Sequence, residues 1–191
     1  MILAVHSDAG YLNESKACSR AGGHFFLSSD VQHPPNNGAI LTIAQIIDAV
    51  MSSTAEAEFI NAKEAVHLWC ILLEMGHPQP RTPIQTDNST AEGVINSRVK
   101  PKRTKLMDMR FEWLLDRQQQ GQFKIYWRPG KTNLADYFTK HHPPLHHRNV
   151  RGEYLTRVSN LQQLRNNSKI LEAGLAMTDR IMLPRFSARV C

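Results

Sequence analysis

The hydrophobic pattern of this chain changes its period near residue 50, and this change limits the folds open to it. Residues 2–8, 21–27 and 39–49 are short segments rich in apolar residues, and we expect three strands there. From Ser53 the apolar residues recur at steps of three and four, as they do on one face of an amphipathic helix. The chain thus contains both kinds of element, and the alternation of helices and strands in its later part favours an α/β fold.

Turn-forming residues determine how the first three strands connect. Ala9-Gly10 follows the first strand, and residues 33–38 form the strongest turn signal in the chain, which ends in Asn37-Gly38. Two hairpin connections in succession predict an antiparallel three-stranded meander.

Helices and strands alternate in the later part of the chain. The expected elements are a helix from Ser53 or Thr54 to Gly76, a strand at 84–86, a helix from Asn88 to Asn96, a helix at 104–120, a strand at 123–127 and a helix at 133–140. Because helices separate the fourth and fifth strands, we expect a parallel crossover between them. The prediction is a five-stranded mixed sheet, a three-strand antiparallel meander plus two parallel strands, flanked by helices.

The composition changes after Lys140. Residues 141–148 are rich in histidine and proline, and the remainder to Cys191 is polar, with one helical pattern near 161–177. We expect a folded domain over residues 1–140 and a His/Pro-rich, weakly ordered tail over 141–191. The histidine pairs lack cysteines or acids at ligand spacing, which disfavours a zinc site.

Charge and composition narrow the possible partners. The formal net charge of +6 favours a polyanionic partner, although a modest basic excess is also common on solvated surfaces. The three cysteines have no paired or metal-ligand spacing, which indicates reduced thiols. No segment approaches the ~18 apolar residues that a membrane span needs, so we expect no membrane partner.

Four carboxylates end or follow expected elements: Asp8, Glu58, Asp87 and Asp136. If the first and fourth strands are neighbours, Asp8 and Asp87 face each other across one strand gap of ~4.8 Å. Acids gathered in this way repel one another unless divalent cations lie among them. Two such ions ~3.5–4 Å apart activate a water and stabilise the leaving oxygen of a phosphodiester. The pattern predicts metal-dependent nuclease chemistry, whereas each acid taken alone fits a turn or cap residue equally well.

Five short motifs follow one another along the chain. They are Ser7-Asp8-Ala9, residues 52–59 (SSTAEAEF), residues 86–91 (TDNSTA), Arg103-Thr104-Lys105 with Asp108-Met109-Arg110, and residues 134–140 (LADYFTK). In these motifs, over residues 1 to about 140, the sequence resembles the ribonuclease H domain of copia-type long-terminal-repeat retrotransposon polyproteins. The resemblance implies a ribonuclease H-like fold and a metal site formed by Asp8, Glu58, Asp87 and Asp136. It also implies two Mg²⁺ ions, for which Mn²⁺ can substitute.

The resemblance further implies an activity and its setting. The expected reaction is hydrolysis of the RNA strand of RNA–DNA hybrids during reverse transcription. The expected partners are the hybrid and the reverse transcriptase portion of the same polyprotein, in a cytoplasmic retroelement particle or in the nucleus. A strand that begins at residue 2 fits a portion of a longer polyprotein, with Met1 as an internal methionine. Many ribonucleases H carry a histidine after the fifth strand; residues 128–132 contain none, so no residue is assigned to product release.

Glu56 and Glu58 compete for one place in the predicted site. They lie ~200° apart on a helix, so only one can face the other acids. The resemblance places the catalytic glutamate directly before an apolar stretch, as Glu58 precedes Phe59-Ile60, and therefore favours Glu58. Glu56 then suits a helix start.

The expected substrate-binding residues are Asn88, Ser89, Thr90, Lys102, Arg103, Lys105 and Arg128. The first three begin a helix, where they bind a phosphate through free N–H groups or simply cap the helix. The lysines and Arg103 belong to a basic run that either grips phosphates or forms a solvated loop. Trp127, at a strand end, fits either the core or a base-stacking surface.

Two other functions remain open. A decayed or domesticated copy would keep the ribonuclease H fold and bind nucleic acid without cutting it, although all four acids are intact. An integrase or transposase has a related sheet, but those enzymes generally use three acids with a glutamate last, whereas here Asp136 is last.

Overall fold

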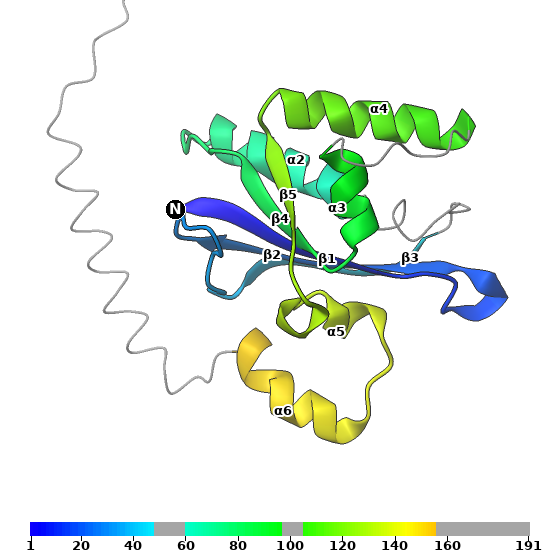
Figure 1. The fold of residues 1–191 in the computed structure, drawn as a ribbon. Coiled ribbons are helices and arrows are strands. Elements are labelled where there is room, and N and C mark those ends of the chain that lie inside the picture. Colours follow the sequence, from blue (N-terminus) through cyan, green and yellow to red (C-terminus); the bar gives the residue numbers. More distant parts are fainter. Residues whose placement is uncertain (48–59, 97–104, 156–191) are drawn as a thin grey trace, which may run out of the picture. The chain divides into compact units, whose positions relative to one another are not determined.

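A five-stranded sheet forms the centre of the computed structural model, which describes residues 1–47, 60–96 and 105–155, except for the side chains of 105–110. The strand order is β3-β2-β1-β4-β5 (Figure 1). The strands are β1 (Ile2–Gly10), β2 (Ser19–Ser28), β3 (Ala39–Ile47), β4 (Thr82–Thr86) and β5 (Phe123–Trp127). β2 pairs antiparallel with β1 and β3, whereas β4 pairs parallel with β1 and β5. The predicted mixed sheet is confirmed.

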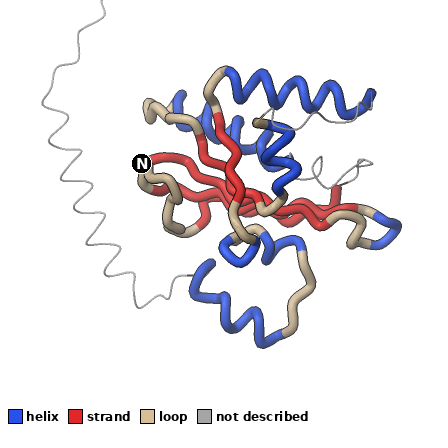
Figure 2. Tube along the Cα trace, in the orientation of Figure 1, coloured by secondary structure: helices blue, strands red, loops and turns tan. Residues whose placement is uncertain are grey.

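Helices cover both faces of this sheet. The helices are α2 (Ile60–Glu74), α3 (Ser89–Ile95), α4 (Lys105–Gln119), α5 (Asp136–Thr139) and α6 (Pro144–Tyr154), with 3-10 turns at Ser15–Ala17 and Gly130–Thr132. In Figure 1, α2, α3 and α4 lie on one side and α5 and α6 on the other. Figure 2 shows the strands as a layer between these two groups.

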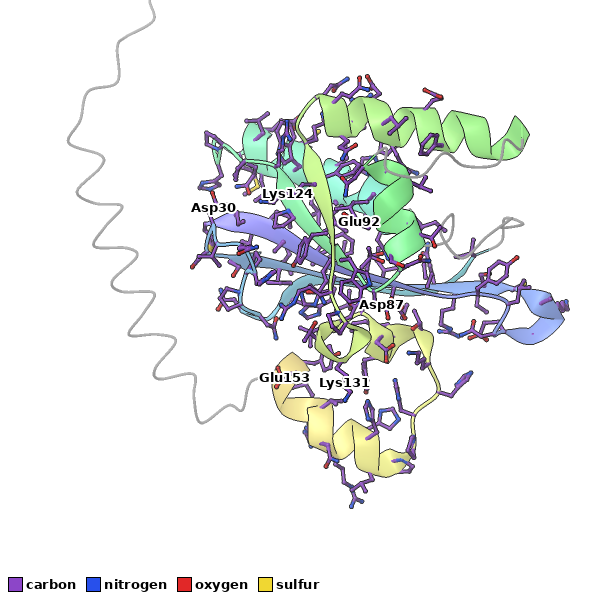
Figure 3. All side chains as sticks on the ribbon, in the orientation of Figure 1. Asp30, Asp87, Glu92, Lys124, Lys131 and Glu153 are labelled. Atoms are coloured by element: carbon purple, nitrogen blue, oxygen red, sulfur yellow. The ribbon has the colours of Figure 1, made fainter. Side chains whose placement is uncertain are left out.

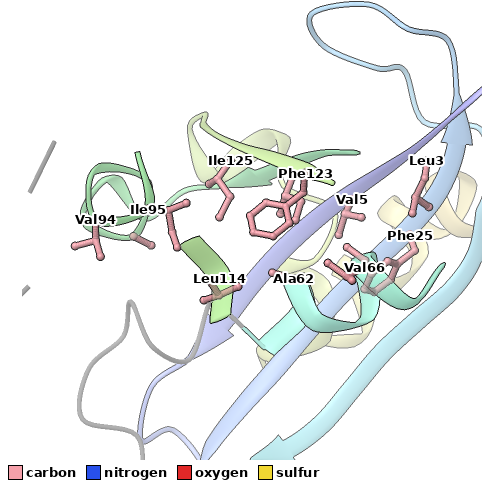
Figure 4. Close-up of a cluster of buried hydrophobic side chains, with 13 residues drawn as sticks. Leu3, Val5, Phe25, Ala62, Val66, Val94, Ile95, Leu114, Phe123 and Ile125 are labelled. Carbon is pink, nitrogen blue, oxygen red and sulfur yellow. The ribbon is translucent and has the colours of Figure 1, made fainter. Parts of the chain in front are cut away.

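The main core fills the space between the sheet and α2–α4 (Figure 4). Side chains alternate between the faces of a strand, so Leu3 and Val5 of β1 point into this core while His6 and Asp8 point to the other face. The labelled members in Figure 4 are Leu3, Val5, Phe25, Ala62, Val66, Val94, Ile95, Leu114, Phe123 and Ile125. The alternation thus brings His6 and Asp8 to the face of β1 on which α5 packs.

Helix α2 contributes to the core through its first half only. Its buried residues are Asn61, Ala62, Ala65 and Val66. The predicted apolar face is therefore confirmed at Ala62 and Val66, but it is wrong at Leu73, which is 43% exposed in the last turn of the helix. The expected cap at Ser53 or Thr54 lies outside the described residues.

Helix α6 forms where we expected a weakly ordered tail. A tail that starts at residue 141 does not describe residues 144–154, which belong to one compact unit with the sheet, Met1–Tyr154. Pro144 occupies the first helical position, which its fixed φ favours. Tyr154 stacks on Tyr137 and donates a hydrogen bond of 2.6 Å to the Leu134 carbonyl. The expected helix at 161–177 lies outside the described residues.

Within the described part of the chain, no helix has both the length and the apolar composition that crossing a membrane requires.

Candidate metal centre

Three of the four predicted acids converge at one end of the sheet. Asp8 lies on β1, Asp87 follows the last residue of β4, and Asp136 is the first residue of α5. One carboxylate oxygen of each lies within 4.8 Å of the others. The register explains the first pair, because Val5 is opposite Ile84 in the parallel ladder and both acids lie three residues further on. Figure 3 shows Asp87 where β4 ends, on the side of α5.

Asp8 is the most buried of the three acids, at 5% exposure. Burial raises the pKa of Asp8, and the nearby charges of Asp87 and Asp136 raise it further. A hydrogen bond that Thr139 Oγ1 donates to Asp8 Oδ2 opposes this rise, as does the positive charge of Lys140. The ionised form of Asp8 is therefore held at an energetic cost, which a cation among the acids would offset.

Asp136 forms an ion pair with the ammonium group of Lys140, four residues later. This hydrogen bond raises the pKa of Lys140, and the charges of Asp136, Asp8 and Asp87 add to the rise. The Lys140 side chain is 55% exposed, and that of Asp136 is 27% exposed. The three acids thus act together on one ammonium at the solvent edge of the cluster.

Two glycines make room for this arrangement. A Cβ on Gly130 would lie 2.6 Å from Asp87 Oδ2. A Cβ on Gly22, which is opposite Asp8 in the β1–β2 ladder, would lie 2.6 Å from Thr139 Cγ2 and 2.7 Å from the Ala135 carbonyl oxygen. The absent side chains allow the loop after β5 to approach Asp87 and allow α5 to pack on β2.

Two buried asparagines fix the backbone around Asp8. Asn61 donates hydrogen bonds to Ser7 Oγ (2.9 Å) and to the Gly22 carbonyl (2.7 Å). Asn133 donates to the Ser7 carbonyl at 2.7 Å and accepts from the Ala135 amide. These bonds join β1 to α2 on one face and to the start of α5 on the other.

The loop between β5 and α5 is held by His6. Its Nδ1 accepts a hydrogen bond of 3.1 Å from the Leu134 amide. Burial, with smaller effects from His24 and Arg128, lowers the pKa of His6 to about 3, so the ring is neutral at physiological pH. His6 and Arg128 line a cavity of about 570 Å³ between this loop, residues 33–36 and α6.

Asn61, Asn133 and Thr139 are site residues that were not predicted from the sequence. Asn61 did leave a signal, since it is a polar residue on the apolar side of a helical pattern. Thr139 lies within the 134–140 motif but was not distinguished from its neighbours.

The predicted substrate-binding residues have different outcomes. Asn88 caps α3, because its side chain accepts hydrogen bonds from the Thr90 and Ala91 amides at 3.0 and 3.1 Å. This supports the capping interpretation, while Ser89 and Thr90 expose their side chains one turn from Asp87.

The remaining predicted site residues are placed only in part. Arg128 lies close to Asp87, because its amide donates a hydrogen bond of 3.0 Å to the Thr86 carbonyl. Arg128 is half-buried and faces the cavity beside His6. Lys105 begins α4, but its side chain is not described. Glu58, together with its rival Glu56, and Lys102 and Arg103 lie outside the described residues.

Trp127 is not a core residue. Its ring is 49% exposed, while its Nε1 donates a hydrogen bond of 2.9 Å to the Asp87 carbonyl. The bond ties the end of β5 to Asp87 and leaves an aromatic surface beside the acids.

Comparisons with known proteins extend these observations. No family model matches the sequence. The Retrovirus-related Pol polyprotein from transposon TNT 1-94 of Nicotiana tabacum is 27% identical over 143 residues, which cover 73% of this chain. The predicted resemblance to a retrotransposon polyprotein is confirmed by this match. The chain spans only 10% of the length of that polyprotein.

Two solved structures share the fold. LC11-RNase H1, isolated from compost by a metagenomic approach, has a TM-score of 0.52 at 12% identity and covers 72% of this chain and 91% of its own. LC11-RNase H1 in complex with an RNA/DNA hybrid also has a TM-score of 0.52, at 11% identity, and covers 71% of this chain and 92% of its own. The chain has a ribonuclease H fold.

Within this ribonuclease H fold, the chemistry of the donor set limits what the centre can bind. Three aspartates offer hard oxygen ligands, with neither sulfur nor imidazole in the cluster of described residues. Such a set fits Mg²⁺ or Mn²⁺ rather than a soft transition metal.

Proposed function

We propose that this chain is a divalent-metal-dependent endonuclease that hydrolyses the RNA strand of RNA–DNA hybrids. The observation that carries the proposal is the convergence of the Asp8, Asp87 and Asp136 carboxylates within 4.8 Å at one end of the sheet. The similarity to a retrotransposon Pol polyprotein supports it, as does a fold shared with a ribonuclease H1 whose structure contains an RNA/DNA hybrid.

In this proposal Asp8, Asp87 and Asp136 hold two Mg²⁺ ions, for which Mn²⁺ can substitute. When bound, the ions supply activation of a water and stabilisation of charge on the leaving oxygen. The water oxygen bonds to phosphorus as the bond to the 3′-oxygen breaks, which leaves a 3′-hydroxyl and a 5′-phosphate. Glu58 is the proposed fourth ligand. In the sequence it precedes by three residues Asn61, whose side chain is hydrogen-bonded to Ser7 beside Asp8.

The chain's own side chains keep the acids in place. Thr139 holds one oxygen of Asp8 through a hydrogen bond to Oδ2. Asn61 and Asn133 fix the strand at Ser7, and Trp127 fixes the backbone at Asp87. Because these groups are positioned before any substrate arrives, little reorganisation remains for the reaction.

We further propose that the hybrid is recognised through its minor groove and the RNA 2′-hydroxyls rather than through base edges. The hydroxyls of Ser89 and Thr90 are exposed and follow Asp87 by two and three residues, which makes them candidates for contacts to the hybrid. The basic residues Lys102, Arg103 and Lys105 stay candidates for phosphate contacts, and their substitution should flatten the salt dependence of hybrid binding.

The proposed setting is reverse transcription, with the polymerase portion of the parent polyprotein as partner, in a cytoplasmic particle or in the nucleus. If this is correct, adding the polymerase portion should increase cleavage of a hybrid by this chain. An unchanged rate would remove the polymerase from the proposal.

The decisive experiment is cleavage of an end-labelled RNA–DNA hybrid by the full chain with Mg²⁺, with Mn²⁺ and with EDTA. We expect cleavage with either ion, and a loss of at least about 10³-fold in Asp87→Asn, because one ligand of the centre is removed. Asp30→Asn is the matched control. Asp30 is an exposed aspartate that follows the end of β2, and this end of β2 pairs with the start of β1, whereas Asp8 lies near the other end of β1 (Figure 3).

The same assay separates the alternatives. Hybrid binding without cleavage would favour an inactive nucleic-acid-binding copy of the fold. Strand transfer on duplex DNA, with the hybrid left intact, would favour an integrase or transposase.

A further inference from the structure

Lys140 places a positive charge inside the acidic cluster that, in the proposed function, binds divalent ions. It follows α5 directly, and its Nζ forms an ion pair with Asp136 Oδ1. Because the three carboxylates lie within 4.8 Å of one another, a cation bound to one of them lies close to the other two. The ammonium thus shares the space in which the ligand oxygens converge.

Its electrostatic effect reaches all three acids. The charges of Asp8 and Asp87 raise the pKa of Lys140 in addition to Asp136, and Lys140 in turn lowers the pKa of Asp8. Among the described residues, the ion pair found between this cluster and a cationic side chain is that of Asp136 with Lys140. Arg128 and Lys131 lie along the preceding loop and line the cavity beside His6, which Asp136 also lines, but within the described part of the chain neither forms an ion pair with the acids.

The side chain of Lys140 is also able to leave. More than half of it (55%) is exposed to solvent, and it is anchored by the pair with Asp136. A lysine has four rotatable bonds and a strongly hydrated ammonium, so it can turn outward without disturbing the fold.

We propose that Lys140 is an internal counter-cation of the acid cluster, which neutralises it when no divalent ion is bound and withdraws when one enters. Two cations cannot share the Asp136 oxygen without strong repulsion, so each bound ion must displace the ammonium. The charge of Lys140 therefore sets the ion concentration at which the centre fills. This inference rests on the proposed function only in that it takes Asp8, Asp87 and Asp136 as divalent-ion ligands.

The test measures ion affinity rather than cleavage. The Mn²⁺ affinity of the full chain is determined from the electron paramagnetic resonance signal of free Mn²⁺. Because Lys140 is half-exposed and its withdrawal into water is inexpensive, we expect Lys140→Met to bind Mn²⁺ about three- to tenfold more tightly than the wild type. Lys140→Arg keeps the charge and should stay within about twofold of the wild type.

Lys124→Met is the matched control, because it removes the same charge from an exposed position on β5. Its Mn²⁺ affinity should equal that of the wild type. An unchanged or weaker affinity in Lys140→Met overturns the proposal, as does an equal gain in Lys124→Met. If Lys140→Met weakens only hybrid binding, Lys140 contacts the substrate instead, and the proposal is likewise overturned.

A second measurement needs no ion. In EDTA, Lys140→Met should lower the thermal midpoint by about 1–3 °C, because the acids lose their counter-charge, and this loss should be smaller in an Asp136→Asn background. An equal loss in both backgrounds contradicts the inference. Absence of hybrid cleavage by the wild type would reject the nuclease function but leave this inference standing, whereas absence of Mn²⁺ binding by both wild type and Lys140→Met would reject both.

Discussion

Replacing Gly130 by alanine should damage the metal centre while leaving the fold intact. The added Cβ would lie 2.6 Å from Asp87 Oδ2, and an ordinary contact begins near 3.4 Å, so the oxygen must move by about 0.8 Å. The neighbour is the free end of a carboxylate rather than backbone, and Gly130 has no positive φ that alanine would resist. The substitution should therefore change the free energy of unfolding by less than about 1 kcal/mol, the scale of one off-rotamer side chain.

The expected functional effect is larger than the effect on stability. A ligand or reacting group displaced by about 1 Å reduces rates by about 10²-fold. We expect a loss of about 10- to 100-fold in hybrid cleavage at limiting Mg²⁺, with a weaker apparent ion affinity. Cleavage is measured across an Mg²⁺ titration, and stability by urea unfolding of the same preparations.

Gly152→Ala is the control for this prediction. Gly152 lies in α6, and a Cβ there would meet nothing within 4 Å. This variant should keep full cleavage and gain slightly in stability, by up to about 1 kcal/mol, because alanine favours a helix. Wild-type cleavage and ion affinity in Gly130→Ala would show that the position of the Asp87 oxygen does not matter, which would refute the assignment of Asp87 as a ligand.

Three further predictions concern stability. Gly22→Ala should cost about 1–3 kcal/mol of unfolding free energy, because the new Cβ would lie 2.7 Å from the Ala135 carbonyl oxygen. That oxygen belongs to the backbone and cannot rotate away as a side chain can. Denaturant unfolding that matches the wild type would contradict this prediction. Tyr154→Phe should cost about 1 kcal/mol of unfolding free energy by removing the hydrogen bond to the Leu134 carbonyl. Denaturant unfolding that shows no such loss would mean that α6 does not pack against this loop. The pKa of His6 is about 3 in the folded protein and near 6.5 in the unfolded chain. Between these pH values the unfolded state binds one more proton than the folded state. The free energy of unfolding therefore falls as the pH drops from about 6.5 towards 3. The slope attributable to His6 should approach about 1.4 kcal/mol per pH unit in that window and disappear in His6→Gln, as measured by urea unfolding at a series of pH values.

The three-stranded meander and the parallel crossover could be predicted because their determinants are local. The apolar segment of β1, the Asn37-Gly38 turn and the helices between β4 and β5 each depend on a few neighbouring residues. The approach of Asp8 to Asp87 required in addition that β1 and β4 be neighbours, since two parallel neighbours bring equivalent positions to one edge.

Helix α6 could not be predicted because its stability depends on a distant contact. Residues 144–154 are polar and none of them is buried, so no apolar period marks the segment. It is held by contacts with residues outside the helix, among them the stack of Tyr154 on Tyr137 and the hydrogen bonds of Tyr154 to the Leu134 carbonyl and of Asn36 to the Glu153 carbonyl. None of these contacts is visible from the composition of the helix itself.

The residues that stabilise the three acids could likewise be predicted only in part from the sequence. The pair of Asp136 and Lys140 has the four-residue spacing of helical ion pairs and can be recognised from sequence alone. The hydrogen bond from Thr139 to Asp8 joins residues 131 positions apart and requires the packing of α5 on β1 and β2. That packing in turn depends on Gly22, whose role is the absence of a side chain.

The 134–140 motif therefore does more than supply one acid. When a protein gathers three carboxylates without a bound ion, the repulsion among them opposes folding. Asp136 adds to that repulsion, while Thr139 and Lys140, the next residues on the same short segment, offset it through Asp8 and Asp136 respectively. The packing of α5 on the sheet thus positions both the third acid and the groups that offset its negative charge. A change that undocks α5 should consequently remove the centre as a whole rather than a single ligand.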